Sequence, residues 1–242
     1  MARLPAADAD ARRLLTSLQR LVDLPESLDI LDVGAAAGLF VLAANRMGHR
    51  AVGVEPWDGA RRVAAQLAQR EGVDVPMLAG AAEELPVEPG RFDVVRAMSV
   101  IEHVRDPQAA FAEAFRALRP GGVFWFFAAS SVCPRQGEIS GFPLFGWYPD
   151  GLKRRIMLWA RDHRPELVGH SKTPAMNWFT PAKARRMLRV AGFREVCDRW
   201  QLPRPVELGA AKRAVLAVVR SSPVTRLLAD VLRPSCAYAA IK

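Results

Sequence analysis

The chain has 242 residues, of which 50% are hydrophobic and 24% are charged, and its formal net charge is +9. This composition provides a buried core and excludes a disordered or collagen-like chain. The three cysteines lie far apart without a Cys-x-x-Cys pair, which argues against a disulfide scaffold or a cysteine zinc site and favours a reducing compartment. The opening MARLPAADADARRLL has acids where a signal peptide needs an apolar stretch, and no window reaches the ~18 apolar residues of a membrane span. We therefore expect a cytoplasmic protein.

The charge is unevenly distributed along the chain. Residues 1–134 carry 14 basic and 17 acidic side chains, whereas residues 135–242 carry 20 basic and 8 acidic ones. Such an asymmetry indicates an anionic partner for the later part, either a phosphorylated or carboxylated substrate, a nucleic acid or an anionic membrane. A solvated basic face without a partner explains the same asymmetry equally well.

Strands and helices alternate in the first half of the chain. An amphipathic helix is predicted over residues 8–22, and apolar strands follow over residues 28–33, 51–55, 75–79, 92–98 and 123–129. Helices are predicted between them over residues 39–47, 58–70 and 107–118. The last helix has Asp106 as its cap and Pro107 at its first position, and we expect Pro120-Gly121-Gly122 to end it. This alternation predicts a parallel sheet that binds its ligand at the carboxyl ends of the strands.

The alternation breaks after residue 129. Residues 130–179 are rich in proline, glycine and aromatic residues, with one predicted helix over residues 149–161. A helix that opens at Thr180 and Pro181 and closes at Gly192 then resumes the pattern. We expect strands over residues 193–200 and 236–241, separated by two amphipathic helices over residues 211–219 and 224–232.

A small-residue turn joins the first strand to the first helix, where the backbone turns sharply and a ligand can approach closely. A dinucleotide-binding fingerprint would need glycine at the first, third and sixth positions, but these are Gly34, Ala36 and Leu39. Residues 32–38 instead have the pattern D-x-G-x-G-x-G with the middle glycine replaced by alanine. Glu55 closes the second strand, where it can accept hydrogen bonds from two ribose hydroxyls. Taken alone, this turn is also compatible with an ordinary strand–helix connection.

Five ordered blocks carry a family resemblance: LDVGAAAG, VGVEPW, GAAEELPVEPGRFDVV, SVIEHVRDP and LRPGG. Together they resemble the class I S-adenosylmethionine-dependent methyltransferases, particularly the small-molecule group that includes ubiquinone-pathway O-methyltransferases. The resemblance covers residues 28–128 well and residues 178–200 weakly. It implies S-adenosylmethionine as the cofactor and is silent about the methyl acceptor.

The resemblance also assigns the cofactor site. It implies that Gly34, Ala35 and Gly38 lie along the methionine and ribose of the cofactor, that Asp32 orients the loop and that Glu55 holds the ribose.

The resemblance assigns a second group of residues to the adenine end of that site. Pro56 is expected beside the adenine together with Trp57, and Ala81, Ala82 and Met98 complete the site. Family members usually have Asp where this chain has Ala81, which removes an acceptor worth roughly 0.5–1.5 kcal/mol. The backbone amides around residues 81–83 can still bind the adenine edge.

The resemblance further implies a Rossmann-like, doubly wound α/β fold. We expect a mostly parallel seven-stranded sheet with helices on both faces and a lid-like insertion after strand five. Residues 1–242 then form one methyltransferase domain. Its parts are an N-terminal helix over residues 1–27, a cofactor-binding core over 28–129, an acceptor-side insertion over 130–179 and a C-terminal part of the sheet over 180–242.

His103 is the best candidate for a catalytic base. Methyl transfer from a sulfonium needs orientation and a desolvated pocket, and it needs a base only for an acceptor that is protonated, such as an alcohol or phenol. The alternative for His103 is a structural histidine that packs the loop. His163 and His170 are candidates for the acceptor pocket, and His49 is expected to be structural. No group of residues has metal-ligand spacing, so we expect no metal.

Two further features bear on the acceptor. The insertion combines aromatic residues with cations, which predicts a lid over an amphiphilic or anionic acceptor, unless the aromatics simply form a small core. The two late amphipathic helices carry arginine and lysine on their polar sides. Such helices can lie on an anionic membrane, or they can pack on the sheet or against a second copy.

The sequence therefore favours S-adenosylmethionine-dependent methyl transfer to an oxygen of a small or lipid-linked, anionic acceptor. One alternative is an RNA methyltransferase, which the basic later part favours. The Asn/Asp-Pro-Pro-aromatic segment of base-amine methyltransferases is missing after the fourth strand, so nucleic acid is not the expected partner. Another alternative is a non-catalytic binding module, which Ala36 and Ala81 would permit. The oligomeric state stays open.

Overall fold

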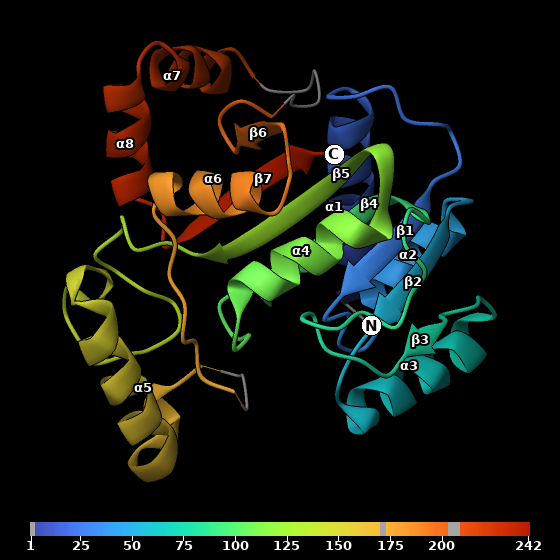
Figure 1. Ribbon diagram of the computed structural model, residues 1–242, viewed down its shortest axis with the longest axis horizontal. Helices are drawn as coiled ribbons and strands as arrows, with labels where there is room; N and C mark the ends of the chain where they lie inside the picture. Colours follow the sequence, from blue (N-terminus) through green and yellow to red (C-terminus); the bar gives the residue numbers. More distant parts are fainter. Residues whose placement is uncertain (1–2, 170–172, 203–208) are drawn as a thin grey trace.

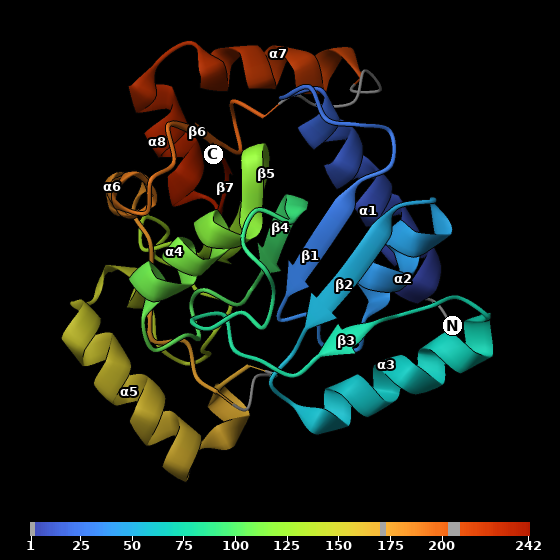
Figure 2. The same ribbon diagram turned by 45° about the vertical axis from the view of Figure 1, so that its right-hand side comes forward.

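Seven strands form one sheet in the computed structural model, which describes residues 3–169, 173–202 and 209–242 (Figures 1 and 2). The strands are β1 (Asp29–Val33), β2 (Arg50–Val54), β3 (Met77–Leu78), β4 (Phe92–Met98), β5 (Leu118–Ala129), β6 (Glu195–Asp198) and β7 (Ser235–Ile241). Their order across the sheet is β3-β2-β1-β4-β5-β7-β6. Neighbouring strands are parallel except that β7 runs antiparallel to both β5 and β6. The predicted mostly parallel, seven-stranded sheet is confirmed.

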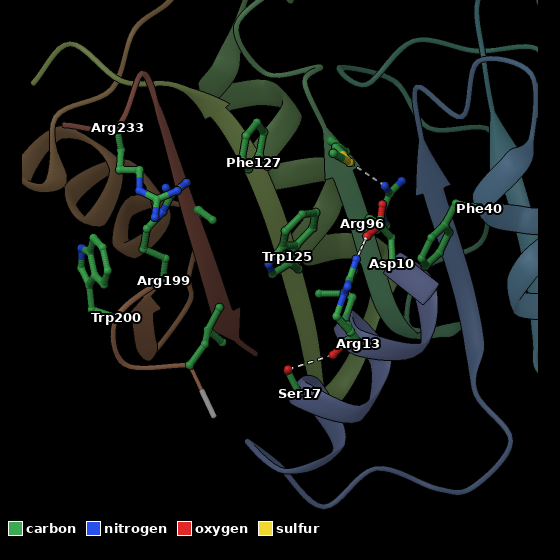
Figure 3. Close-up of a pocket in the computed structure, with 14 residues that line it drawn as sticks. Asp10, Arg13, Ser17, Phe40, Arg96, Trp125, Phe127, Arg199, Trp200 and Arg233 are labelled. Atoms are coloured by element: carbon green, nitrogen blue, oxygen red, sulfur yellow. Dashed lines mark hydrogen bonds and ion pairs between the residues drawn. The ribbon is translucent and has the colours of Figure 1, made fainter. Parts of the chain in front are cut away.

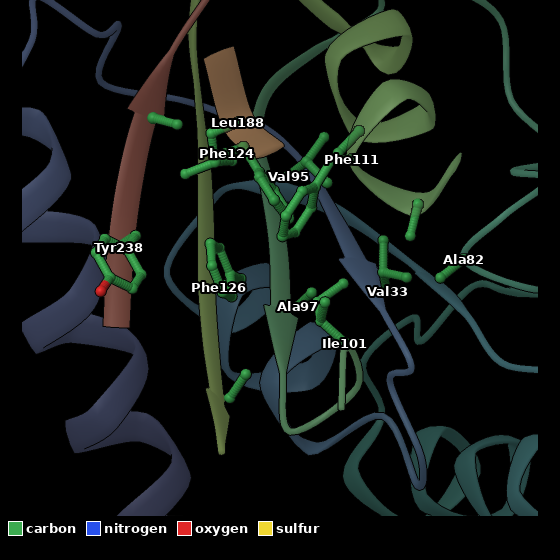
Figure 4. Packing of buried hydrophobic residues seen from close by; sticks show 14 of the residues in the cluster. Val33, Ala82, Val95, Ala97, Ile101, Phe111, Phe124, Phe126, Leu188 and Tyr238 are labelled. Atoms are coloured by element: carbon green, nitrogen blue, oxygen red, sulfur yellow. The ribbon is translucent and has the colours of Figure 1, made fainter. Parts of the chain in front are cut away.

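Helices cover both faces of this sheet, as predicted. They are α1 (Arg3–Gln19), α2 (Leu39–Arg46), α3 (Asp58–Glu71), α4 (Pro107–Ala117), α5 (Asp150–His163), α6 (Pro181–Val190), α7 (Ala210–Arg220) and α8 (Pro223–Val231). On one face, Phe111 of α4 and Leu188 of α6 pack against the aromatic residues of β5 (Figure 4). On the other face, α1, α2 and α3 bury a second cluster that includes Leu15, Val41 and Leu67. Among the described residues, no helix is long and apolar enough to cross a membrane.

Local signals set several helix boundaries where the sequence predicts them. The Asp106 side chain accepts hydrogen bonds from the backbone amides of Gln108 and Ala109, which satisfies two amides at the start of α4. The Thr180 side chain does the same for Lys183 at the start of α6. The helices α7 and α8 also lie within one residue of the predicted ranges.

The start of β5 differs from the prediction. The helix α4 ends at Ala117, and β5 begins at Leu118 rather than at residue 123. Leu118 is fully buried and pairs with Phe92, and the register then shifts to Val94 opposite Val123. Pairing with β4 therefore draws Pro120-Gly121-Gly122 into an irregular part of the strand, and this segment does not end the helix.

The two edge strands are shorter than predicted. The strand expected over residues 75–79 covers only Met77–Leu78, and the one expected over residues 193–200 covers only Glu195–Asp198. Each edge strand has only one neighbouring strand. It therefore extends only as far as its residues pair with that neighbour, which is β2 for β3 and β7 for β6. The first helix, in contrast, begins at Arg3 and not at residue 8.

The insertion after β5 has its own small core. Its ordered elements are α5 and two short 3₁₀ helices, η1 (Phe145–Trp147) and η2 (Pro165–Leu167). Phe145, Met157 and Trp178 are buried together. In both ribbon views α5 stands away from the sheet (Figures 1 and 2). The aromatic side chains at 145 and 178 are therefore core residues, which agrees with the alternative of a small core that the sequence left open.

The loop between β1 and α2 adopts left-handed backbone conformations. Gly34 has φ +67° and Gly38 has φ +71°, and an added Cβ would lie 2.3 Å from Val100 Cγ2 or 2.5 Å from Val75 Cγ1, respectively. Ala36, between them, has φ +49°. An L residue in this region carries a strain of roughly 1–2 kcal/mol. The loop therefore keeps its glycine geometry although alanine replaces the middle glycine.

Ala36→Gly is expected to raise the free energy of unfolding by about 0.5–1 kcal/mol. The substitution relieves the left-handed strain but loses part of that gain to the freedom of glycine in the unfolded chain. Urea unfolding measures the change. The matched control is Ala65→Gly on the exposed side of α3, which should lower the free energy by about 1 kcal/mol. Equal destabilisation by both substitutions would contradict this account of the loop.

Candidate cofactor site

A cleft of about 490 Å³ opens at the carboxyl ends of β1, β2 and β4. This volume lies within the usual range for small-molecule sites. The cleft is lined by Val33, Gly34, Ala36, Val54, Glu55, Pro56, Trp57, Ala60, Gly80, Ala81, Ala82, Glu83, Ser99, Val100, His103, Val104, Arg105 and Thr173. It therefore lies where parallel sheets bind their ligands.

The Glu55 carboxylate is held in the cleft by backbone amides from two loops. Glu55 Oε2 accepts a hydrogen bond from Ala36 N at 2.9 Å, and Oε1 accepts one from Trp57 N at 3.1 Å. The residue is 8% exposed. A carboxylate has about four acceptor positions, so both oxygens can accept further hydrogen bonds from a ligand. Two adjacent hydroxyls, as in a ribose, match this arrangement.

Asp32 supports the loop from beneath. It is almost fully buried and forms an ion pair with Arg96. Burial raises the pKa of Asp32, and the Arg96 guanidinium opposes this effect. Arg96 in turn stacks on Phe40, with 4.1 Å between its Cζ and the ring centroid. Arg96 of β4 thus contacts both Asp32 of β1 and Phe40 of α2, next to the glycine loop.

The structure brings together most of the predicted site residues. Gly34, Glu55, Pro56, Ala81, Ala82 and His103 all line the cleft. Asp32, Ala35 and Gly38 lie behind it: Ala35 N donates to Val54 O, and Gly38 packs closely beside Val75 and Ala64 of α3.

Met98 lies elsewhere. Side chains alternate along a strand, so Arg96 and Met98 share the face of β4 that carries α1 and α2. Met98 Sδ accepts a hydrogen bond from Arg96 there, and both residues line a separate cavity. The expected place of Met98 in the cofactor site therefore does not match its position.

Sequence reasoning missed several lining residues. Ser99 and Val100 directly follow β4, at the same edge of the sheet as Glu55. Ser99 has φ +54°, a strained conformation that is common at functional sites. Its position after a central strand was the available signal. Thr173 comes from the insertion, and no local pattern points to it.

The insertion fixes the segment that follows β4. Met176 N and Asn177 N both donate to Glu102 O, at 2.7 and 3.0 Å. Asn177 Nδ2 also donates to Val104 O at 2.8 Å. The Glu102 side chain is 1% exposed, and burial raises its pKa to about 8. Its Oε2 has no hydrogen-bond partner among the described residues.

His103 lies between the cleft and the insertion. Its Nε2 is 4.0 Å from Glu138 Oε2, and its Nδ1 is buried without a hydrogen-bond partner in the part of the chain that the structure describes. The Glu138 carboxylate of the insertion therefore faces the His103 ring at the border of the cleft.

The other histidines lie away from the cleft or beyond the described residues. His163 stacks on Trp159 near the end of α5. His49 accepts a hydrogen bond from Leu28 N at 3.3 Å, which is a structural contact. His170 lies outside the described residues. Within those residues, no group of three histidine, cysteine or acidic side chains is placed to hold a metal ion.

Comparison with known proteins identifies the family. The methyltransferase domain family matches residues 31–126. A ubiquinone biosynthesis O-methyltransferase from Paramagnetospirillum magneticum is 31% identical over 178 residues, which is 73% of this chain and 67% of that protein. The chain belongs to the S-adenosylmethionine-dependent methyltransferases. The predicted family, with S-adenosylmethionine as its cofactor, is thereby confirmed.

Two further comparisons show the extent of the likeness. A ubiquinone biosynthesis O-methyltransferase from Rhizobium etli is 37% identical over 129 residues, which is 52% of either chain, and this chain spans about half the length of most such relatives. The structure of an S-adenosylmethionine-dependent methyltransferase from Mesorhizobium loti has a TM-score of 0.59 at 19% identity. It covers 90% of this methyltransferase and 94% of the M. loti chain. This structural likeness supports the fold alone.

The residues of the cleft fit the cofactor of the family. The anchored Glu55 carboxylate matches the two ribose hydroxyls, and the half-exposed Trp57 indole lies at the rim, where it can contact an adenine. Ala81 and Ala82, with their small side chains, line the same cleft.

Proposed function

We propose that this methyltransferase transfers the methyl group of S-adenosylmethionine to an oxygen of a small acceptor that is anionic or lipid-linked. The observation that carries the proposal is the Glu55 carboxylate, anchored by Ala36 N and Trp57 N in the cleft at the carboxyl ends of the strands. The names of the relatives support oxygen as the acceptor atom. We further infer that residues 1–242 act as one methyltransferase domain, and the three free cysteines support a cytoplasmic location.

The cleft residues have distinct roles in this proposal. Glu55 accepts hydrogen bonds from the ribose hydroxyls, and Gly34 lets the cofactor pass close to the loop backbone. Pro56, Ala81 and Ala82 flank the adenine. The bound cofactor supplies an electrophilic methyl group for in-line attack by the acceptor oxygen. Orientation of the two reactants in the cleft contributes a large part of the acceleration that such a reaction needs.

His103 acts as the general base in this proposal. It takes the proton from the acceptor hydroxyl as the oxygen attacks, and Glu138 stabilises the resulting imidazolium across the 4.0 Å between Nε2 and Oε2. The buried Asn177 and Glu102 fix the backbone on either side of His103. The insertion therefore contributes Glu138 to the reaction and holds the base in place.

Glu55→Ala is expected to weaken the binding of S-adenosylhomocysteine by roughly 1.5–3 kcal/mol, because the ribose loses charge-assisted hydrogen bonds. Calorimetric titration measures this loss, with NADH as a competitor that should not displace the ligand. Glu26→Ala, an exposed acid outside the cleft, is the matched control and should leave the affinity unchanged. If the intact protein does not bind S-adenosylhomocysteine at millimolar concentration, the non-catalytic alternative replaces this proposal.

His103→Gln is expected to lower kcat by about 10²–10⁴-fold while the affinity for S-adenosylhomocysteine stays unchanged. The loss should shrink for a more acidic phenol that is already ionised at the assay pH, since such an acceptor needs no base. Glu138→Gln should lower kcat in the same direction by a smaller factor. Equal losses for weakly and strongly acidic phenols would assign His103 a structural role. Turnover of RNA, lost at high salt, would favour the nucleic-acid alternative.

The helices α7 and α8 support a membrane contact. Six aliphatic side chains on or directly after these helices are 51–80% exposed: Val215, Val218, Val224, Leu227, Leu228 and Leu232. The helix α7 also carries Lys212, Arg213 and Arg220, and no acidic residue. A second copy of this surface would be repelled by the like charges, whereas anionic lipids complement them. We therefore propose that α7 and α8 lie on an anionic membrane, near which a lipid-linked acceptor would be concentrated.

Sedimentation with vesicles tests this contact. The protein is expected to bind vesicles rich in phosphatidylglycerol at least ~10-fold more tightly than phosphatidylcholine vesicles, and less so at high salt. The double substitution of Val218 and Leu228 by serine should abolish most of this binding. Val190→Ser at the end of α6, where Val190 is 71% exposed, is the control and should have no effect. A dimer in solution that the double variant dissociates would instead assign these helices to a second copy.

A further inference from the structure

A second cavity, of about 420 Å³, lies on the sheet face that carries α1 (Figure 3). Its walls come from α1 and α2, from β4, β5 and β7, and from the segments that follow β6 and α8. It is lined by Asp10, Arg13, Leu14, Ser17, Phe40, Arg96, Met98, Trp125, Phe127, Arg199, Trp200, Leu202, Arg233 and Ala237. None of the residues to which the proposed function gives a role lines this cavity. Met98 borders it, and the next residue, Ser99, borders the cofactor cleft.

Two of the four arginines in this cavity are neutralised by acidic residues. Arg13 pairs with Asp10 on α1, and Arg96 pairs with the buried Asp32. These two pairs contribute little net charge to the cavity.

The other two arginines lack such partners. Figure 3 shows the guanidinium groups of Arg199 and Arg233 side by side. Neither forms an ion pair with a residue that the structure describes. The Arg199 Nε is buried without a hydrogen-bond partner among those residues, and Arg199 Nη2 donates a hydrogen bond to Ser235 Oγ at 3.3 Å. Burial, together with the nearby Arg233, lowers the pKa of Arg199. The acid in reach, Asp230, accepts a hydrogen bond from Trp200 Nε1 at 2.7 Å.

This arrangement is unfavourable without an anion. The partly buried Arg199 loses hydration and also lies beside the like charge of the exposed Arg233. An anion with two or more oxygens would bridge them, because guanidinium groups bind carboxylate and phosphate in a forked geometry. The remaining wall is largely apolar, and it includes the aromatic rings of Trp125, Phe127 and Trp200. Such a wall fits a flat or extended apolar body.

We propose that this cavity binds a small organic anion, with its carboxylate or phosphate on Arg199 and Arg233 and its apolar body against Trp125 and Phe127. The inference rests on the arginine pair and the aromatic wall and does not depend on methyl transfer. It therefore adds a second ligand site to the protein, on the face of the sheet opposite to α4.

Calorimetric titration with 2-naphthoate tests the site. Removing one charge-assisted contact should weaken binding at least ~10-fold, so Arg233→Gln and Arg199→Gln are each expected to cause a loss of this size. The uncharged 2-naphthamide, and inorganic phosphate without an apolar body, should each bind at least ~10-fold more weakly than 2-naphthoate. Arg189→Gln, an exposed arginine on α6, is the matched control and should bind normally.

Several results would overturn the proposal. If 2-naphthoate and 2-naphthamide bind with equal affinity, the cavity recognises an apolar body and not an anion. If inorganic phosphate binds as tightly as 2-naphthoate, the cavity recognises an anion without an organic body. Unchanged binding by Arg233→Gln would place the anion elsewhere, and this exposed residue keeps the test decisive even if the more buried Arg199→Gln fails to fold. The affinity for S-adenosylhomocysteine, measured on the same variants, should not change. Failure of the unsubstituted protein to bind S-adenosylhomocysteine, with 2-naphthoate bound as expected, would count against the methyltransferase proposal and leave the anion site standing.

Discussion

The carboxylate of Glu55 joins the two loops on which the cofactor site depends. Because β1 and β2 are parallel neighbours, the loops that follow them emerge side by side, and Glu55 accepts one backbone amide from each. These charge-assisted hydrogen bonds fix Ala36 and Trp57 on opposite sides of the carboxylate. The loop after β1 can reach this position only through its left-handed residues. The parallel pairing of β1 and β2, the left-handed loop residues and the Glu55 side chain therefore depend on one another.

A buried ion pair between Asp32 and Arg96 connects the glycine loop to the sheet face that carries α1. Asp32 lies under the glycine loop, and its partner Arg96 lines the arginine-rich cavity. Breaking such a pair leaves an uncompensated buried charge, which typically costs about 3–5 kcal/mol. On the other side of β4, the insertion anchors the segment around His103 through Asn177. The candidate site is therefore built from residues distant in sequence. The Asp32–Arg96 pair supports the loop after β1, and the insertion supports the segment around His103.

Much of the fold follows from local patterns, and much of the site from strand ends. Apolar strands, the Asp106 cap and the position of Glu55 could be located because each depends on nearby residues. The start of β5 depends on pairing with β4, so Pro120-Gly121-Gly122 gave a wrong boundary. The position of Met98 depends on which face of β4 it shares with Arg96. Glu138 and Thr173 reach the site only because the insertion folds around its own small core, which no spacing in the sequence indicates.

A crystal structure of the protein with S-adenosylhomocysteine tests the central claim most directly. The account predicts both ribose hydroxyls within about 2.6–3.2 Å of the Glu55 carboxylate oxygens, with the adenine beside Trp57 and Ala82. It also predicts that the Ala36 and Trp57 amides keep their hydrogen bonds to Glu55. A ribose bound away from Glu55, or S-adenosylhomocysteine bound in the cavity of Arg199 and Arg233 instead of the cleft, would contradict this prediction.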